Sequence, residues 1–278
     1  MKSVCLNGEF FPAHMPILMS DNRSYRYGDG LFETIKVVNG KLQLGDFHFE
    51  RLFNSMDLLK MNRPAFFSQE KITENISRLN KKNGCFELGR VRLSVFRGNG
   101  GLYEKDQSAQ YLIECWPLDK STTYLNNNGL LIDIYSSAVK TCDALSNIKS
   151  ANFIAYALGA IYAKEQKLND CLLLNTYGNV ADATIANVFI IQNGSIITPS
   201  LDQGCVNGVM RRWMLQQLPA IGFRVIEKPV TIDDLEKSDE IFLTNAVSKM
   251  RWVKQFRQRT YTNVTIAEVF NRLGDPAQ

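Results

Sequence analysis

Histidine is scarce in this chain. Its 278 residues include only His14 and His48. Neither has a second metal-binding side chain at helical spacing, so the sequence favours neither a zinc centre nor a Ser/His/Asp triad. Proton transfer in an active site of this chain would therefore fall to a lysine, a tyrosine or a carboxylate.

Closely spaced cysteines and long apolar runs are also missing. The six cysteines lie far apart, form no CxxC pair and mostly have apolar neighbours, a pattern typical of buried, reduced thiols in a cytoplasmic protein. The longest apolar run, residues 153–163, is shorter than the roughly 18 to 20 residues of a membrane helix, and the N-terminal segment lacks the apolar core of a signal peptide. We therefore expect a soluble, unprocessed protein with no membrane partner.

Positively charged residues only slightly outnumber negatively charged ones. The formal charge of +4 is small for this length, and the lysines and arginines are scattered, so no basic stripe for nucleic acid is indicated. A composition of 45% hydrophobic and 22% charged residues is that of an ordinary globular protein. The length predicts about two domains.

The best domain boundary is a polar stretch at residues 117–128, where Asp, Ser, Thr and three consecutive asparagines interrupt the apolar pattern. We predict an N-terminal α/β domain at 1–117, a linker at 118–128 and a C-terminal domain at 129–278. Apolar periodicity predicts strands at 3–6, 30–38, 41–44, 90–96, 110–116, 130–136, 171–175, 186–192, 195–198, 224–228 and 240–244. It predicts helices at 46–61, 69–82, 151–166, 208–218 and 266–273, which gives a mixed α/β fold.

Lys149 is the first residue that could take part in catalysis. It precedes a predicted helix rich in Ala, Phe, Ile and Tyr, where partial desolvation would lower the pKa of its amine and favour the neutral, nucleophilic form. From this segment alone, a solvated lysine at a helix start is the commoner case.

Two further segments could bind phosphate. Residues 204–212 run from a glycine-flanked turn into a helix, whose free N–H groups and dipole attract anions. Arg51, one turn after His48 on a predicted helix, could bind phosphate through two parallel hydrogen bonds. Taken singly, an ordinary turn and a solvated arginine are the commoner readings of these two patterns.

Asp182 lies among small residues just ahead of a predicted buried strand. A carboxylate placed against a pyridinium nitrogen keeps that nitrogen protonated, although a turn or helix cap would also suit an aspartate here. The glycine-rich run Arg97 to Tyr103 matches neither a Walker A loop nor a dinucleotide fingerprint. We interpret it as a flexible loop between strands that could border an active site.

The order of these segments resembles one family over nearly the whole chain. The resemblance rests on residues 27–33 (YGDGLFE), 48–52, Lys149, 182–189, 204–212 and 243–246 (LTNA). It is with the class IV aminotransferases, which include branched-chain aminotransferases, D-amino acid aminotransferases and 4-amino-4-deoxychorismate lyases. It implies two α/β domains with pyridoxal 5′-phosphate (PLP) in the cleft between them, and a homodimer that lends residues across its interface.

The resemblance also implies residue roles. Lys149 would be the catalytic residue, carrying PLP as a Schiff base and moving the substrate Cα proton. The residues implied to bind the cofactor are Lys149, Arg51, Asp182, Thr184, Ile185, Val209, Met210, Asn245 and Ala246, with the backbone N–H groups of Val209 and Met210 on the phosphate. The residues implied to border the substrate pocket are Phe32, Arg97 and Tyr103.

Three departures from the family pattern bear on activity. Asp182 stands where the family usually has the longer Glu, so its contact with the ring nitrogen would need a backbone shift or a bridging water. Leu102 stands where the lyases carry arginine, whereas Thr244-Asn245-Ala246 is closer to the lyase pattern than to the Gly-Thr-Ala of aminotransferases. The leading hypothesis is amino-group transfer between an amino acid and a 2-oxo acid. The alternatives are a lyase that releases pyruvate and 4-aminobenzoate, and a PLP-binding protein without turnover.

Overall fold

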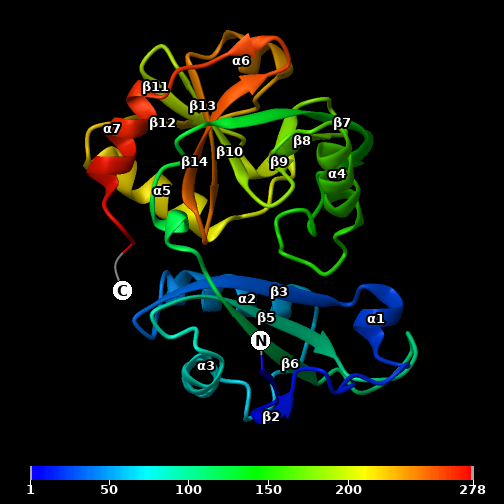
Figure 1. Ribbon diagram of the computed structural model, residues 1–278. Coiled ribbons are helices and arrows are strands. Elements are labelled where there is room, and N and C mark those ends of the chain that lie inside the picture. Colours follow the sequence, from blue (N-terminus) through cyan, green and yellow to red (C-terminus); the bar gives the residue numbers. More distant parts are fainter. Residues whose placement is uncertain (1, 277–278) are drawn as a thin grey trace. The chain divides into compact units, whose positions relative to one another are not determined.

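The computed structural model describes residues 2–276 and divides into two compact units (Figure 1). Among the described residues, unit 1 comprises 2–120 and 148–152, and unit 2 comprises 121–147 and 153–276. The chain first leaves unit 1 inside the predicted linker. The segment around Lys149, however, packs with unit 1, although the division at 118–128 assigned it to the C-terminal domain.

Unit 1 is built on an antiparallel sheet in the order β2-β1-β6-β5-β3-β4. Its strands are β1 (Ser3–Leu6), β2 (Glu9–Pro12), β3 (Gly30–Val38), β4 (Lys41–Leu42), β5 (Leu88–Arg97) and β6 (Ala109–Pro117). Its helices are α1 (Arg23–Tyr27), α2 (Gly45–Leu58) and α3 (Gln69–Asn83), and a 3-10 turn, Lys120–Thr123, follows β6. The predicted hairpin turn at Asn39-Gly40 is confirmed, since both residues adopt the positive φ that this turn requires.

The apolar face of the unit 1 sheet packs against α2 and α3. In β3, Leu31, Ile35 and Val37 point into this core, where they join Leu52 of α2 and Ile76 of α3. Alternation along the strand places Phe32 and Thr34 on the opposite face. Glu33 shares the face of Leu31 and Ile35 and so lies buried in this core.

Unit 2 contains a larger mixed sheet in the order β12-β11-β10-β13-β14-β7-β8-β9, with β15 beside β14. Its strands are β7 (Leu130–Lys140), β8 (Asp170–Asn175), β9 (Val180–Ala183), β10 (Asn187–Gln192), β11 (Ser195–Thr198), β12 (Arg224–Glu227), β13 (Glu240–Asn245), β14 (Lys249–Phe256) and β15 (Arg259–Thr260). Strand β9 also contacts β10, so the sheet curls around an aliphatic core that includes Ile134, Val188 and Leu243.

The helices of unit 2 are α4 (Ile154–Glu165), α5 (Val209–Ala220), α6 (Ile232–Lys237) and α7 (Val264–Leu273), and a 3-10 turn, Leu201–Gln203, precedes α5. Helix α6 contributes Leu235 to the core around which the sheet curls. Helix α4 packs on β7 and β8, while α5 and α7 lie side by side against β13 (Figure 1). Among residues 2–276, no helix combines the length and the apolar character needed to cross a membrane.

Most of the predicted elements are confirmed, and three strands, at 3–6, 30–38 and 195–198, have the predicted bounds. The elements missing from the prediction are β2, α1, β9, α6, β14 and β15, most of which are short. Strand β14 is longer, but Arg251 and Lys254 interrupt its apolar pattern. Helix α4 begins at Ile154 rather than at 151, because Ser150 and Ala151 are held in an extended conformation by β3.

Candidate active site

Lys149 is positioned by backbone pairing with the edge of β3. Ser150 forms an antiparallel bridge with Leu31, the Phe32 N–H donates to the Lys149 carbonyl (3.0 Å), and the Ala151 N–H donates to the Gly30 carbonyl (2.8 Å). The Lys149 ammonium nitrogen lies 4.5 Å from the centre of the Phe32 ring. Lys149 is therefore fixed in an extended segment rather than at the helix start that the sequence suggested.

Arg51 lies in a buried cluster with Glu33 and His48, all on the helix-covered face of the unit 1 sheet. Its Nε donates to Glu33 Oε1 (2.8 Å), and a terminal nitrogen of the same guanidinium donates to Oε2. His48 Nδ1 lies 2.6 Å from Glu33 Oε2. An ionised carboxylate can only accept, so Nδ1 carries the proton. Among the described residues, the buried Nε2 of His48 has no hydrogen-bond partner.

The charges in this cluster set its protonation states. Burial alone would raise the pKa of Glu33, but the charges of and hydrogen bonds from Arg51 and His48 outweigh it and lower that pKa to about 2. Burial lowers the pKa of His48, as do the nearby charges of Arg51 and Lys149, while Glu33 acts in the opposite direction. Glu33 is therefore ionised over the whole ordinary pH range.

Arg97 and Tyr103, both predicted to border the substrate pocket, lie in very different environments. The buried guanidinium of Arg97 pairs with Asp29 and donates to the carbonyl of Leu59. The side chain of Tyr103 is 98% exposed. Phe32, the third predicted pocket residue, is buried and contacts both Lys149 and Arg92 through its ring.

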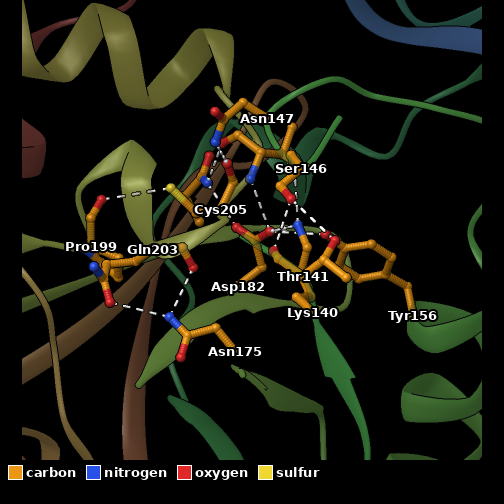
Figure 2. Close-up of polar contacts among 12 residues, drawn as sticks. Lys140, Thr141, Ser146, Asn147, Tyr156, Asn175, Asp182, Pro199, Gln203 and Cys205 are labelled. Atoms are coloured by element: carbon orange, nitrogen blue, oxygen red, sulfur yellow. Dashed lines mark hydrogen bonds and ion pairs between the residues drawn. The ribbon is translucent and has the colours of Figure 1, made fainter. Parts of the chain in front are cut away.

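Asp182 lies in β9 at the centre of a polar cluster in unit 2 (Figure 2). Its Oδ2 accepts from the Lys140 ammonium (2.9 Å), the Tyr156 hydroxyl (2.9 Å) and the Val206 N–H (3.0 Å). Its Oδ1 accepts from the Asn187 amide (2.9 Å). The Asp182 carboxylate therefore does not cap a turn or a helix. It accepts hydrogen bonds from side chains of β7, α4 and β10 and from one backbone N–H in the loop before α5.

Amide side chains hold the loop that leads into α5. Asn147 donates to the carbonyls of Leu201 (2.9 Å) and Cys205 (2.6 Å), and its own carbonyl accepts from the Asn207 N–H (2.9 Å). On the other side of the loop, Asn175 donates to the backbone and the side chain of Gln203 (Figure 2). Asn147 is the last residue of unit 2 before the Lys149 segment.

The start of α5 is close to Asn187. Gly208 is the N-cap and, being glycine, has no side chain with which to cap this helix end. A Cβ on Gly208 would lie 1.9 Å from Asn187 Oδ1, so only glycine fits here. Thr244 of β13 pairs in register with Asn187, and its buried hydroxyl has no hydrogen-bond partner among the described residues.

The other predicted cofactor residues of unit 2 are placed as follows. Val209 and Met210 form the first turn of α5, as predicted. The Asn245 side chain accepts from the N–H groups of Val247 and Ser248 and so closes the turn after β13 that contains Ala246. The Thr184 hydroxyl donates to Asp170 (2.6 Å), and Ile185 is 64% exposed.

A family model described as amino-transferase class IV matches residues 30–256. The chain belongs to the class IV aminotransferases. The match covers both units, including Lys149, Asp182 and the start of α5.

This class IV aminotransferase is similar both to proteins named as aminotransferases and to proteins named as lyases. A Methanocaldococcus jannaschii protein named for branched-chain-amino-acid aminotransferase activity is 26% identical over 272 residues, which are 97% of this chain and 93% of that protein. The aminodeoxychorismate lyase of Bacillus subtilis is 28% identical over 255 residues, which are 88% of this chain and 83% of the lyase. The relatives therefore include both an aminotransferase and a lyase.

A solved structure shares the fold of this class IV aminotransferase. A hypothetical aminotransferase from Mycobacterium tuberculosis, in its PLP-bound form, has a TM-score of 0.85 and 21% sequence identity, and covers 98% of this chain and 96% of that chain. The predicted two-domain class IV fold is confirmed by this likeness.

Four residues of the site in this class IV aminotransferase were not identified from the sequence: Lys140, Tyr156, Asn187 and Thr244. Asn187 and Thr244 lie inside the motifs that carried the resemblance, so their positions beside Asp182 and Asn245 could have drawn attention to them. Lys140 is 42 positions from Asp182, and no local pattern connects the two.

Replacing Glu33 by Gln should destabilise the protein most at neutral pH, by roughly 3 to 5 kcal/mol, because Arg51 would remain buried without its counter-charge. The folded-state pKa of Glu33 is lowered, so its stabilising effect is present above the unfolded value of 4.5 and is lost as pH falls towards about 2. The difference between variant and wild type should therefore shrink below pH 4.5. Urea unfolding at several pH values measures it, with exposed Glu165→Gln as the control. A difference that does not change with pH would contradict this account.

Replacing Gly208 by Ala should push the Asn187 amide away from Asp182 and from the Val206 carbonyl, both of which it now reaches. We expect a loss of about 1 to 3 kcal/mol in unfolding free energy. Gly101→Ala is the matched control, because a Cβ there meets nothing within 4 Å. Equal melting temperatures for the two variants would show that Asn187 and Gly208 are not coupled.

Proposed function

We propose that this class IV aminotransferase uses PLP to transfer an amino group from an amino acid to a 2-oxo acid, with Lys149 as its catalytic residue. The observation that carries the proposal is the position of Lys149, whose backbone is fixed to the edge of β3 and whose amine lies against the Phe32 ring. A nucleophilic amine needs both a fixed origin and a partly apolar surrounding, because desolvation favours its neutral form.

The described residues of unit 2 suit the phosphate of PLP. The start of α5 offers N–H groups and a positive dipole end. Beside it, β13 carries the Thr244 hydroxyl, which is buried without a hydrogen-bond partner among residues 2–276. A buried hydroxyl in that state is costly unless a ligand completes it, and a phosphate oxygen would do so.

The positively charged guanidinium of Arg51 would also bind the phosphate of PLP. Glu33 holds one edge of the guanidinium through Nε and one terminal nitrogen, which fixes the plane of the group. An arginine whose orientation is already fixed loses less side-chain entropy when it binds an anion. Glu33 would therefore act on phosphate binding through Arg51.

When bound, PLP supplies an aldehyde that forms a Schiff base with an amine and a ring that withdraws electrons from the substrate Cα. The amine of Lys149 would provide the nucleophile and then accept the Cα proton and return it. The Phe32 ring would exclude water from one side of that amine. Asp182 would face the ring nitrogen, with its carboxylate held by Asn187 and the Val206 N–H.

Lyase chemistry on 4-amino-4-deoxychorismate is the second candidate. Two observations favour it: the segment Thr244-Asn245-Ala246 and the 28% identity with the lyase of Bacillus subtilis. Both reactions need Lys149, so its mutation does not separate them. Pyruvate formed from 4-amino-4-deoxychorismate without any 2-oxo acid would identify the lyase, whereas turnover that depends on a 2-oxo acid would identify the aminotransferase.

Replacing Lys149 by Ala should lower the turnover number by at least about a thousandfold, because the nucleophile and the proton carrier are lost together. The assay measures amino-group transfer from a panel of L- and D-amino acids to 2-oxo acids, with the lyase substrate tested in parallel. Lys164→Ala, at the exposed end of α4, is the matched control and should retain wild-type turnover. Comparable turnover in the two variants would exclude Lys149 as the catalytic residue.

We also propose that the protein is a homodimer and that α4 forms part of the interface. This helix exposes an apolar stripe of Ile154 (66%), Leu158 (41%) and Ile161 (54%), residues spaced to lie on one side of it. Exposed apolar stripes of this kind are typical of interfaces between subunits.

Replacing Ile161 by Asp should weaken the dimer by at least about tenfold, because it would bury an unpaired charge in the interface. Light scattering after size-exclusion chromatography, over a range of protein concentrations, measures the mass. Exposed Lys237→Ala, on α6 and away from this stripe, is the control and should leave the mass unchanged. A wild-type protein that is monomeric at all concentrations would refute the proposed dimer.

A further inference from the structure

We propose that α7 braces the phosphate site of unit 2, with Lys249 as the positioning residue that connects the helix to the site. The inference rests on the proposed function, since that function places the phosphate of PLP beside Thr244 and the start of α5. It deepens the function by assigning part of the affinity for phosphate to a residue that acts through the β13–β14 turn and does not itself touch the cofactor.

Lys249, the first residue of β14, has a backbone conformation that is unusual for lysine. It pairs in register with Asn245 and so closes a three-residue turn, in which Asn245 Oδ1 accepts from the Val247 and Ser248 N–H groups. Its φ of +57° lies in the left-handed region, where glycine is the usual residue at the end of such a turn. A lysine is strained there, and such strain persists only where the surrounding structure holds the residue.

The structure that holds Lys249 is the C-terminal end of α7. The Lys249 side chain is 7% exposed, and its Nζ donates to the carbonyls of Phe270 (3.3 Å) and Gly274. The same nitrogen lies 4.2 Å from the centre of the Phe270 ring and 3.8 Å from Asp275 Oδ1. Carbonyls at a helix C-terminus carry a partial negative charge, so a buried ammonium at this end stabilises the helix.

The N-terminal end of α7 is held by the other end of β13. Glu240, which begins β13 and is 3% exposed, accepts from the N–H groups of Thr265 (2.9 Å) and Ile266 (2.8 Å) in the first turn of α7. A carboxylate at a helix N-terminus is stabilised by the helix dipole. Glu240 and Lys249 thus lie on either side of Thr244 in the chain and attach both ends of α7 to this strand and its turn.

Helix α7 is also attached to α5. The Arg272 guanidinium donates to the carbonyl of Ile221, the C-cap of α5, and lies 5.1 Å from the centre of the Phe223 ring. The two helices lie side by side against β13 (Figure 1). One helix therefore contacts both parts of the proposed phosphate site. Loss of the Lys249 contact would let the turn after β13 move relative to the start of α5, which weakens the binding of a phosphate held by both.

The test is equilibrium dialysis of the whole chain against PLP and, separately, against pyridoxal, which lacks the phosphate. Lys249→Gly removes the ammonium and relieves the backbone strain, so it should raise the Kd for PLP by at least about tenfold and leave the Kd for pyridoxal unchanged. Lys249→Arg, which keeps a cation of similar reach, should resemble wild type. Lys167→Gly is the matched control and should also resemble wild type, because Lys167 has the same φ of +57° and is exposed.

A second variant decides the question if Lys249→Gly does not fold. Arg272→Gln removes the hydrogen bond between α7 and the Ile221 carbonyl, at a side chain that is 47% exposed. It should raise the Kd for PLP about threefold, again without affecting pyridoxal, because the spacing between α5 and α7 is then less well fixed.

The outcomes separate the claims. An unchanged Kd for PLP in folded Lys249→Gly, or in Arg272→Gln if the first variant does not fold, overturns the inference. Equal weakening of PLP and pyridoxal binding also overturns it, since Lys249 would then be merely structural. A wild-type protein that binds PLP no more tightly than pyridoxal would instead refute the proposed phosphate site, and one that binds no PLP would refute the proposed function itself.

Discussion

The candidate active site depends on a short stretch of backbone pairing between residues 148–152 and the edge of β3. Hydrogen bonds from Phe32 to Lys149 and from Ala151 to Gly30 hold the segment extended. They delay the start of α4 until Ile154 and place the Lys149 amine beside Phe32. At the start of β3, a Cβ on Gly30 would lie 2.8 Å from the Val95 carbonyl oxygen of β5 and from Ser24 Oγ, so glycine is required there by the neighbouring strand and by α1.

Buried carboxylates organise both units by the same physical rule. Burial of a charge is costly unless cations and hydrogen-bond donors surround it. Glu33 satisfies the rule with Arg51 and His48, and Asp182 does so with Lys140, Tyr156, Asn187 and the Val206 N–H. Glu33 thereby orients Arg51, which has a proposed role in phosphate binding, whereas Asp182 is itself held in place for its proposed role at the cofactor ring.

The sequence predicted well those features that are encoded locally. Apolar alternation marked β3, the Asn39-Gly40 turn marked its end, and glycine before an amphipathic segment marked the start of α5. Features that depend on distant residues were not predictable in this way. The partners of Asp182 come from β7, α4, β10 and the loop before α5, and the burial of Arg97 depends on Asp29 and Leu59. The environment of a polar side chain is set by the tertiary structure, which one-dimensional patterns do not contain.

The central claim is that the Lys149 amine is the group to which PLP attaches. The most direct test is to add PLP to the wild-type protein, reduce the complex with borohydride, digest it and locate the modification by mass spectrometry. The account predicts one reduced phosphopyridoxyl group, on the peptide that contains Lys149. Modification of another lysine, such as Lys140, or none after saturation with PLP, would contradict it.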